Sequence, residues 1–207
     1  MSGVVKSVGL RERRRRQTSL EIHRAALELA SERGFDNVTV EEIATAAGVS
    51  PRTFFNYFTT KESAIVHAPL DITAEQAAEF VASKRTRHSE ILDDAIAVIS
   101  AGLAESPPSR QQMADLRTVA LNSVAVSSAV LAEFDAFQRR LAVLIAQRTG
   151  AEPDDDIPVL IASLALTVVR VGMDRWATIE SEKSDSPVPH VQHAARLVQG
   201  FFSAPGR

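Results

Sequence analysis

The sequence predicts an all-α protein, with a small N-terminal helical domain followed by a larger C-terminal helical domain. Apolar residues recur every three or four positions along most of the chain, as the buried face of a helix requires. Helix-start signals, in which Thr is followed three residues later by Glu, stand before two of the early stretches. No segment shows the alternation of apolar and polar residues that is typical of a strand. Together these observations favour helices throughout.

The composition narrows the class of protein. Hydrophobic residues make up 45% of the 207 residues and charged residues 24%, which is ordinary for a globular protein of one domain or two small ones. No apolar run approaches 18 residues, so we expect no membrane span. The early "RERRRR" lacks a following apolar segment, so it is not a secretory signal. The absence of cysteine excludes disulfides, thiol catalysis and cysteine zinc sites, and it suits the cytoplasm.

Residues 1–17 carry little apolar pattern and are expected to form a flexible basic arm. The first helix is expected to start at "TSLE", Thr18–Glu21, which has the form of a capping box. Ile22 and Leu29 belong to its apolar stripe, and Gly34 ends it as a C-terminal cap.

A second capping box, Thr39–Glu42, is expected to start a short second helix that ends near Gly48. Ser50 is a good N-cap and Pro51 suits the first helical position, so a third helix should run to about Phe58. Thr60 then caps a fourth helix that begins at Lys61. Two short helices joined by a tight glycine turn form the helix-turn-helix pattern, whose second helix enters the DNA major groove.

The charge distribution favours the same hypothesis. Residues 1–61 hold ten Lys or Arg and seven Asp or Glu, whereas the rest of the chain has an excess of six acids. A basic end joined to an acidic body indicates that the basic end meets a polyanion. The alternative is that the arginines belong only to a solvated tail, because basic runs are common in tails.

The segment "AALELASERGFDNVTVEEIATAAGVSPRTFFNYFTTKESAI" resembles the DNA-binding domain of the TetR family of bacterial transcriptional repressors. The resemblance covers about a quarter of the chain. It implies a helix-turn-helix domain at 18–66 and a helical effector-binding and dimerisation domain at 67–207. It also implies a cytoplasmic homodimer that binds double-stranded operator DNA and is released by a small hydrophobic or amphipathic effector, with no cofactor and no catalysis.

The resemblance also sorts the side chains of the helix-turn-helix. Phe54 and Phe58 fall on core positions. Phe55 falls where the family usually has a tyrosine, so a phosphate contact through a hydroxyl is missing there. Phe55 is expected to contact a sugar or a thymine methyl instead. The residues implied to contact phosphate are Tyr57 and Lys61, and Thr39 either joins them or only caps its helix. The arm residues Arg13, Arg14, Arg15 and Arg16 are expected to enter the minor groove or lie along phosphates. The candidates for reading bases are Ser50, Arg52, Thr53 and Asn56, since Arg pairs well with guanine and Asn with adenine.

In the C-terminal part, helices are expected at about 89–104, 110–123, 127–148, 157–181 and 190–202, and "DITAEQAAEFVASKR" should resume helix after a kink or break at Pro69. By resemblance the last two helices form the dimer. The candidate effector pocket comprises Met113, Arg117, Phe134, Phe137, Arg170, Met173 and Trp176. The alternative for each is plain core packing, and Arg170 could simply pair with Asp174 four residues on.

Enzyme and metal sites find little support. The sequence has no glycine-rich phosphate loop, and His190 and His193 lack a third ligand at a suitable spacing. Two rival functions stay open beside a ligand-released repressor. One is a DNA-binding regulator or architectural protein without a small ligand, and the other, more distant, is a helical interaction module.

Overall fold

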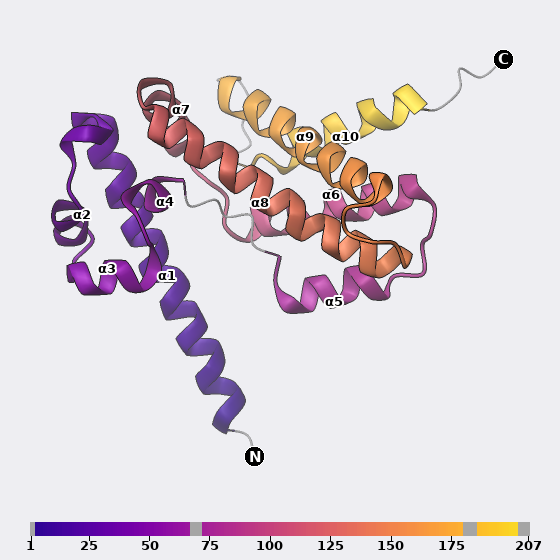
Figure 1. The fold of residues 1–207 in the computed structure, drawn as a ribbon, viewed down its shortest axis with the longest axis horizontal. Coiled ribbons are helices and arrows are strands. Elements are labelled where there is room, and N and C mark those ends of the chain that lie inside the picture. Colours follow the sequence, from indigo (N-terminus) through magenta and orange to yellow (C-terminus); the bar gives the residue numbers. More distant parts are fainter. Residues whose placement is uncertain (1–2, 67–71, 180–185, 203–207) are drawn as a thin grey trace. The chain divides into compact units, whose positions relative to one another are not determined.

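The computed structural model describes residues 3–66, 72–179 and 186–202. Within these ranges every regular element is a helix, so the all-α prediction is confirmed (Figure 1). The chain divides into two compact units, one of Met1–His67 with Gln111–Leu131 and the other of Ala68–Arg110 with Ala132–Arg207. Pro69, where a kink or break was expected, lies outside the described residues.

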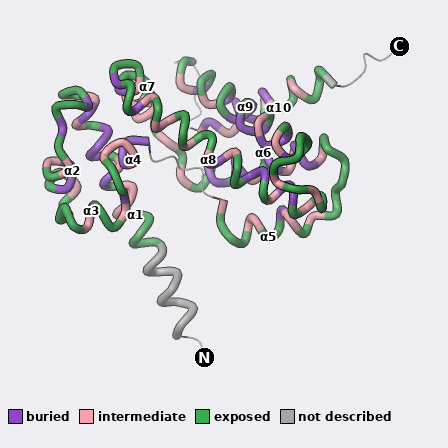
Figure 2. Tube along the Cα trace, in the orientation of Figure 1, coloured by how far each residue is buried: buried purple, intermediate pink, exposed green. Residues whose placement is uncertain are grey.

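The first unit contains the predicted helix-turn-helix. Its elements are α1 (Gly3–Arg33), the 3-10 turn η1 (Phe35–Asn37), α2 (Val40–Ala46), α3 (Pro51–Tyr57), α4 (Lys61–Ile65), most of α7 (Arg110–Asn122) and the start of α8 (Val124–Thr149). Ile22, Ile43 and Phe54 are fully buried where these helices meet. Figure 2 shows the buried positions gathered at this junction, with exposed positions around it.

The predicted start of the first helix is wrong. The helix α1 begins at Gly3, so residues 3–17 form its first turns and are not a flexible arm. Thr18 therefore lies in the interior of a helix and caps nothing. The physical reason is that arginine, glutamate and leucine are good helix formers and no proline interrupts residues 3–17.

The first unit also takes in residues beyond the predicted range 18–66. Val119 of α7 and Val126 of α8 are buried in the same apolar cluster as Ile22 and Phe54. In addition, the Ser31 hydroxyl of α1 donates a hydrogen bond of 3.0 Å to the Asp115 carboxylate of α7. The DNA-binding unit is thus assembled from two separate stretches of the sequence.

The second unit contains α5 (Ala74–Ala82), α6 (His88–Glu105), the remainder of α8, α9 (Asp156–Thr178) and α10 (Val188–Phe202). Each helix was predicted, with ends that differ by up to three residues. Ser89 was expected to start α6, but that helix starts at His88, and the Glu90 carboxylate accepts hydrogen bonds from the Arg87 backbone N–H and guanidinium. Apolar residues of α6, α8, α9 and α10 share one core.

The expectation that no segment is long and apolar enough to span a membrane is wrong for α9. Asp156–Thr178 meets both requirements by length and composition. However, one face of α9, including Ile161, Ala165 and Val169, is buried in the core of the second unit. The continuous apolar character of α9 is therefore that of a central core helix.

Candidate nucleic-acid interface

The turn between α2 and α3 has the geometry that the sequence predicted. Gly48 has a φ of 68°, a conformation that other residues adopt at a cost, and the Val49 N–H donates to the Ala44 carbonyl at 2.9 Å. The Ser50 hydroxyl caps α3 by accepting from the Thr53 N–H at 3.0 Å, with Pro51 at the first helical position. Local signals thus place α3 at a fixed angle after α2.

The aromatic residues of α3 separate into an inner and an outer set. Phe54 and Phe58 are buried, as predicted, and their ring centroids lie 5.9 Å apart. Phe55 lies outside with 54% of its surface exposed, and its ring is nearly perpendicular to that of Phe54, with the ring centroids 5.4 Å apart. Because the buried Phe54 packs α3 against the core of the unit, the opposite face of the helix points to solvent.

The outer face of α3 carries the candidates for base reading. Arg52, Phe55 and Asn56 are exposed, and their spacing of three and four residues puts them on one face. Thr53 is half-buried, and its hydroxyl lies 2.8 Å from that of Ser50. The structure therefore brings Arg52, Phe55 and Asn56 together, while Ser50 and Thr53 are already paired with each other at the N-terminus of the helix.

The N-terminal part of α1 supplies a contact that sequence reasoning missed. The Arg15 guanidinium lies 5.9 Å from the centre of the Tyr57 ring, within the range of a cation–π interaction. The first turns of α1 continue past α3 in Figure 1. Arg13, Arg14, Arg15 and Arg16 are all exposed. Arg15 thus lies beside the end of α3, and the other three arginines surround the same turn of α1.

Thr39 has its hydroxyl occupied at the start of α2. It accepts from the Glu42 N–H at 3.2 Å, and the Glu42 carboxylate accepts from the Thr39 N–H at 2.9 Å, which confirms the predicted capping box. The hydrogen bond from the Thr39 backbone N–H lowers the pKa of Glu42, helped by the Thr39 hydroxyl and the charge of Arg33. The exposed Thr39 lies at the surface, beside an ionised carboxylate.

Lys61 has a role inside the unit that sequence reasoning missed. Its ammonium group donates to the carbonyls of Phe35 at 2.8 Å and Val38 at 2.9 Å, and it lies 4.1 Å from the centre of the Phe35 ring. These contacts fasten the start of α4 to the turn that follows α1. Two of the three ammonium protons are used in these hydrogen bonds. The side chain that was expected to contact phosphate therefore contributes to the fold.

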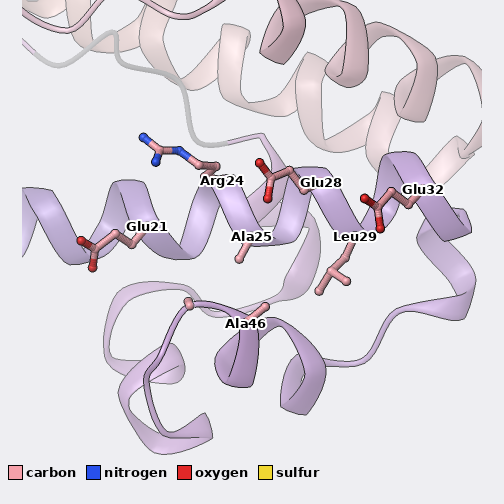
Figure 3. Close-up of a pocket in the computed structure, with 8 residues that line it drawn as sticks. Glu21, Arg24, Ala25, Glu28, Leu29, Glu32 and Ala46 are labelled. Atoms are coloured by element: carbon pink, nitrogen blue, oxygen red, sulfur yellow. The ribbon is translucent and has the colours of Figure 1, made fainter.

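The opposite sign of charge marks another face of the first unit. Three carboxylates of α1, Glu21, Glu28 and Glu32, and one cation, Arg24, line a hollow of about 260 Å³ beside Ala46 of α2. Figure 3 shows these carboxylates along α1, with Leu29 directed toward the helix that carries Ala46. Carboxylates repel phosphate, so the charge of this face is less suited to DNA than that of the outer face of α3 and the arginines of α1.

The predicted effector residues are divided between the two units. Met113 and Arg117 belong to the first unit, and the other five belong to the second. Phe137 and Trp176 are buried, and Met173 packs against the core, which agrees with the core alternative. The Arg110 guanidinium lies over the Trp176 ring, 5.0 Å from its centre, and donates to the Ile179 carbonyl at 2.7 Å.

Three of the seven effector candidates, Arg117, Phe134 and Arg170, lie at the surface. Phe134 is 37% exposed, and the exposed Arg170 lies 3.7 Å from Asp174, the pairing that its spacing allowed.

Comparisons with known proteins agree with the geometry. The family model described as "Bacterial regulatory proteins, tetR family" matches residues 22–66, and the one described as "MftR C-terminal domain" matches residues 95–200. The transcriptional regulator TcmR of Streptomyces glaucescens is 32% identical over 178 residues, which cover 81% of this chain and 76% of TcmR. The chain belongs to the TetR family of bacterial transcriptional regulators.

Other TetR relatives extend the likeness over most of the chain. A protein named as the mycofactocin biosynthesis transcriptional regulator MftR of Mycobacterium tuberculosis is 26% identical over 172 residues, covering 82% of this chain and 84% of that protein. A crystal structure of a TetR-family regulator from Syntrophomonas wolfei covers 92% of this chain and 99% of its own, with a TM-score of 0.56 and 14% identity. At this identity the likeness concerns the fold alone. The predicted function as a DNA-binding transcriptional regulator is confirmed by family membership.

Proposed function

We propose that this TetR-family protein is a cytoplasmic homodimeric repressor that reads its operator with α3. The exposed outer face of α3, with Arg52 and Asn56 on one side of a helix anchored by Phe54, carries the proposal. Arg52 can grip guanine with two hydrogen bonds and Asn56 can do the same with adenine. Tyr57 and the α1 arginines would contact the backbone, which adds affinity on any sequence.

The second unit supports a homodimer through its exposed apolar residues. Ile157, Leu160, Leu164 and Val171 of α9 are 37–56% exposed and repeat on one face of that helix. Leu197 and Phe201 of α10 are 49% and 78% exposed and stand four residues apart. Large exposed apolar residues in a row mark an interaction surface. A two-fold dimer would place two recognition helices about 34–36 Å apart, one turn of DNA, or further apart on a longer operator.

Release by a small effector follows from linkage. Consider a state of the dimer in which the two DNA-binding units are too far apart or too close for the operator. An effector that binds this state more tightly than the DNA-binding state must lower operator affinity by the ratio of its two affinities. By reciprocity the operator lowers effector affinity by the same factor, and couplings of about 1–3 kcal/mol are typical. The rival function, regulation without a ligand, is favoured by the close packing of Phe137 and Trp176, which were candidates for a pocket and are core residues.

Selection of bound sequences from a random DNA pool tests base reading. The wild type should select an inverted repeat, and Arg52→Ala should lose preference at one base pair of each half-site, a discrimination of about 1–3 kcal/mol. Arg139→Ala is the matched control, because Arg139 is an exposed arginine of α8 in an ion pair with Asp135. It should select the wild-type sequence. If Arg52→Ala also selects the wild-type sequence, Arg52 does not read a base.

A further inference from the structure

The second unit has a trough on its outside, between α6 and α10. Its volume is about 540 Å³, within the range of small-molecule sites. The two helices run antiparallel along it, since Asp93 lies beside Gln199 and the trough ends near Ala104 and Val188. From Asp93 to Ala104 it extends about 16 Å, at 1.5 Å per residue. None of the predicted effector residues lines it.

The wall formed by α6 is mainly apolar beyond Asp93, and the hydroxyl of its one other polar lining residue, Ser100, donates to the Ile96 carbonyl. Ala97, Ala101 and Ala104 repeat at four and three residues, so their small side chains face the hollow in a row. Ile96 and Val188 add larger apolar surface at its sides. A helix with side chains is 10–12 Å across, too wide for a hollow of this volume and length. A slender apolar chain fits it better.

The rim formed by α10 is polar and carries one cation. Gln192, Arg196 and Gln199 repeat at four and three residues along that helix. The Gln199 amide donates to the Asp93 carboxylate at 2.7 Å and closes one end, and Arg85 lies 4.0 Å from the same carboxylate and offsets its charge. Among the described residues Arg196 takes part in no ion pair, and it is exposed. The trough thus offers an unpaired guanidinium beside an apolar channel.

The trough stays accessible in the proposed dimer. Leu197 stands nine residues after Val188, and Phe201 stands nine residues after Gln192. Nine residues correspond to about 180° around a helix. The exposed apolar residues of α10 therefore point away from the trough, and a dimer formed through them leaves the trough open to solvent.

We propose that this trough binds an amphipathic small molecule with an apolar chain and an anionic head group. The chain lies along Ala97, Ala101 and Ala104, and the head pairs with Arg196. A guanidinium on a polar rim favours an anion by charge, and a carboxylate can accept two hydrogen bonds from it. As the effector site, this assignment rests on the proposed function as a ligand-released repressor.

Calorimetric titration of the full-length protein with sodium laurate, below its micelle-forming concentration, tests the site. Laurate should bind the wild type, and dodecyltrimethylammonium, with the same chain and a cationic head, should bind more weakly. Arg196→Gln should weaken laurate about three- to fivefold, as for an exposed ion pair. Ala101→Leu, a good helix former that fills the hollow, should weaken it about tenfold or more.

Arg175→Gln is the matched control, because Arg175 is exposed on α9 and does not line the trough. It should leave laurate affinity unchanged. The site is refuted if laurate does not bind, if it binds all variants equally, or if the cationic analogue binds as tightly.

Operator titrations of the same proteins separate the two proposals. Laurate that binds at the trough and lowers operator affinity supports both. Binding at the trough with unchanged operator affinity supports the site and refutes its role as effector site. A protein that selects no DNA sequence refutes the proposed function, while the laurate results still decide the trough.

Discussion

Replacing Lys61 by methionine should destabilise the first unit more than it weakens DNA binding. Methionine keeps an apolar chain but removes the ammonium that donates to the Phe35 and Val38 carbonyls at 2.8 and 2.9 Å. A hydrogen bond to a charged group contributes about 1.5–3 kcal/mol when fully buried. Lys61 is half-buried, and both carbonyls can be rehydrated, so we expect about 2 kcal/mol for the pair.

The contact with the Phe35 ring at 4.1 Å adds roughly 0.5–1 kcal/mol. For a unit of this size, 1 kcal/mol corresponds to about 4–8 °C in the midpoint of thermal unfolding. The Lys61→Met variant should therefore unfold roughly 10–20 °C earlier in the transition that reports the first unit. Circular dichroism during heating measures this shift. Lys84→Met is the control, because Lys84 is exposed, and its transition should not move.

Operator affinity measured at low temperature, where the variant remains folded, completes the test. If Lys61 serves the fold, affinity should stay within about twofold and the salt dependence should keep its slope, because the protein still neutralises the same phosphates. The reasoning would be refuted by an unchanged melting temperature together with lower affinity on all sequences and a slope reduced by about one. That result would return Lys61 to the DNA backbone, as the family resemblance implied.

Two further predictions concern α1 and α2. Deleting residues 1–16 removes arginines of α1, including Arg15 beside Tyr57, so affinity for every DNA sequence should fall. The slope of affinity against salt concentration should shrink by roughly one for each phosphate that is no longer neutralised. Unchanged affinity and slope in titrations across salt would limit these residues to a structural role. The pKa of Glu42 is lowered from 4.5, so its contribution to stability is present above about pH 4.5 and is lost as the pH falls through the lower folded value. Glu42→Gln should therefore flatten the dependence of the urea midpoint on pH in that acidic window, and a dependence equal to that of the wild type would contradict the capping role.

The helix-turn-helix could be predicted from sequence because its signals are local. The capping pair of Thr39 and Glu42, the positive φ of Gly48 and the cap at Ser50 each act within five residues of chain. The split of Phe54 inside and Phe55 outside was implied by the resemblance to the TetR family, and the burial of the two side chains agrees with it. The sequence was therefore enough to predict which residues lie on the outer face of α3.

The remaining features depend on contacts between distant parts of the chain. Lys61 lies 26 residues from Phe35, and no sequence pattern announces that an ammonium will meet its carbonyl. The box at Thr18 has the same spacing of Thr and Glu as the one at Thr39, but only the residues before it decide whether a helix starts there. The effector candidates were chosen from both units, since Met113 belongs to the first and Trp176 to the second, and periodicity cannot tell which unit a helix joins.

The split of the DNA-binding unit between residues 1–67 and 111–131 constrains how such proteins can be recombined. A chimera joined after residue 66 would receive a reading head without the Val119 and Val126 that complete its apolar cluster, and without the Asp115 partner of Ser31. Ile22 of the transplanted unit would then pack against α7 and α8 side chains of the recipient protein, and the resulting voids or clashes would lower stability. Exchange of specificity between relatives should thus succeed by transplanting the exposed residues of α3, and transplanting the whole head should require the α7–α8 corner to travel with it.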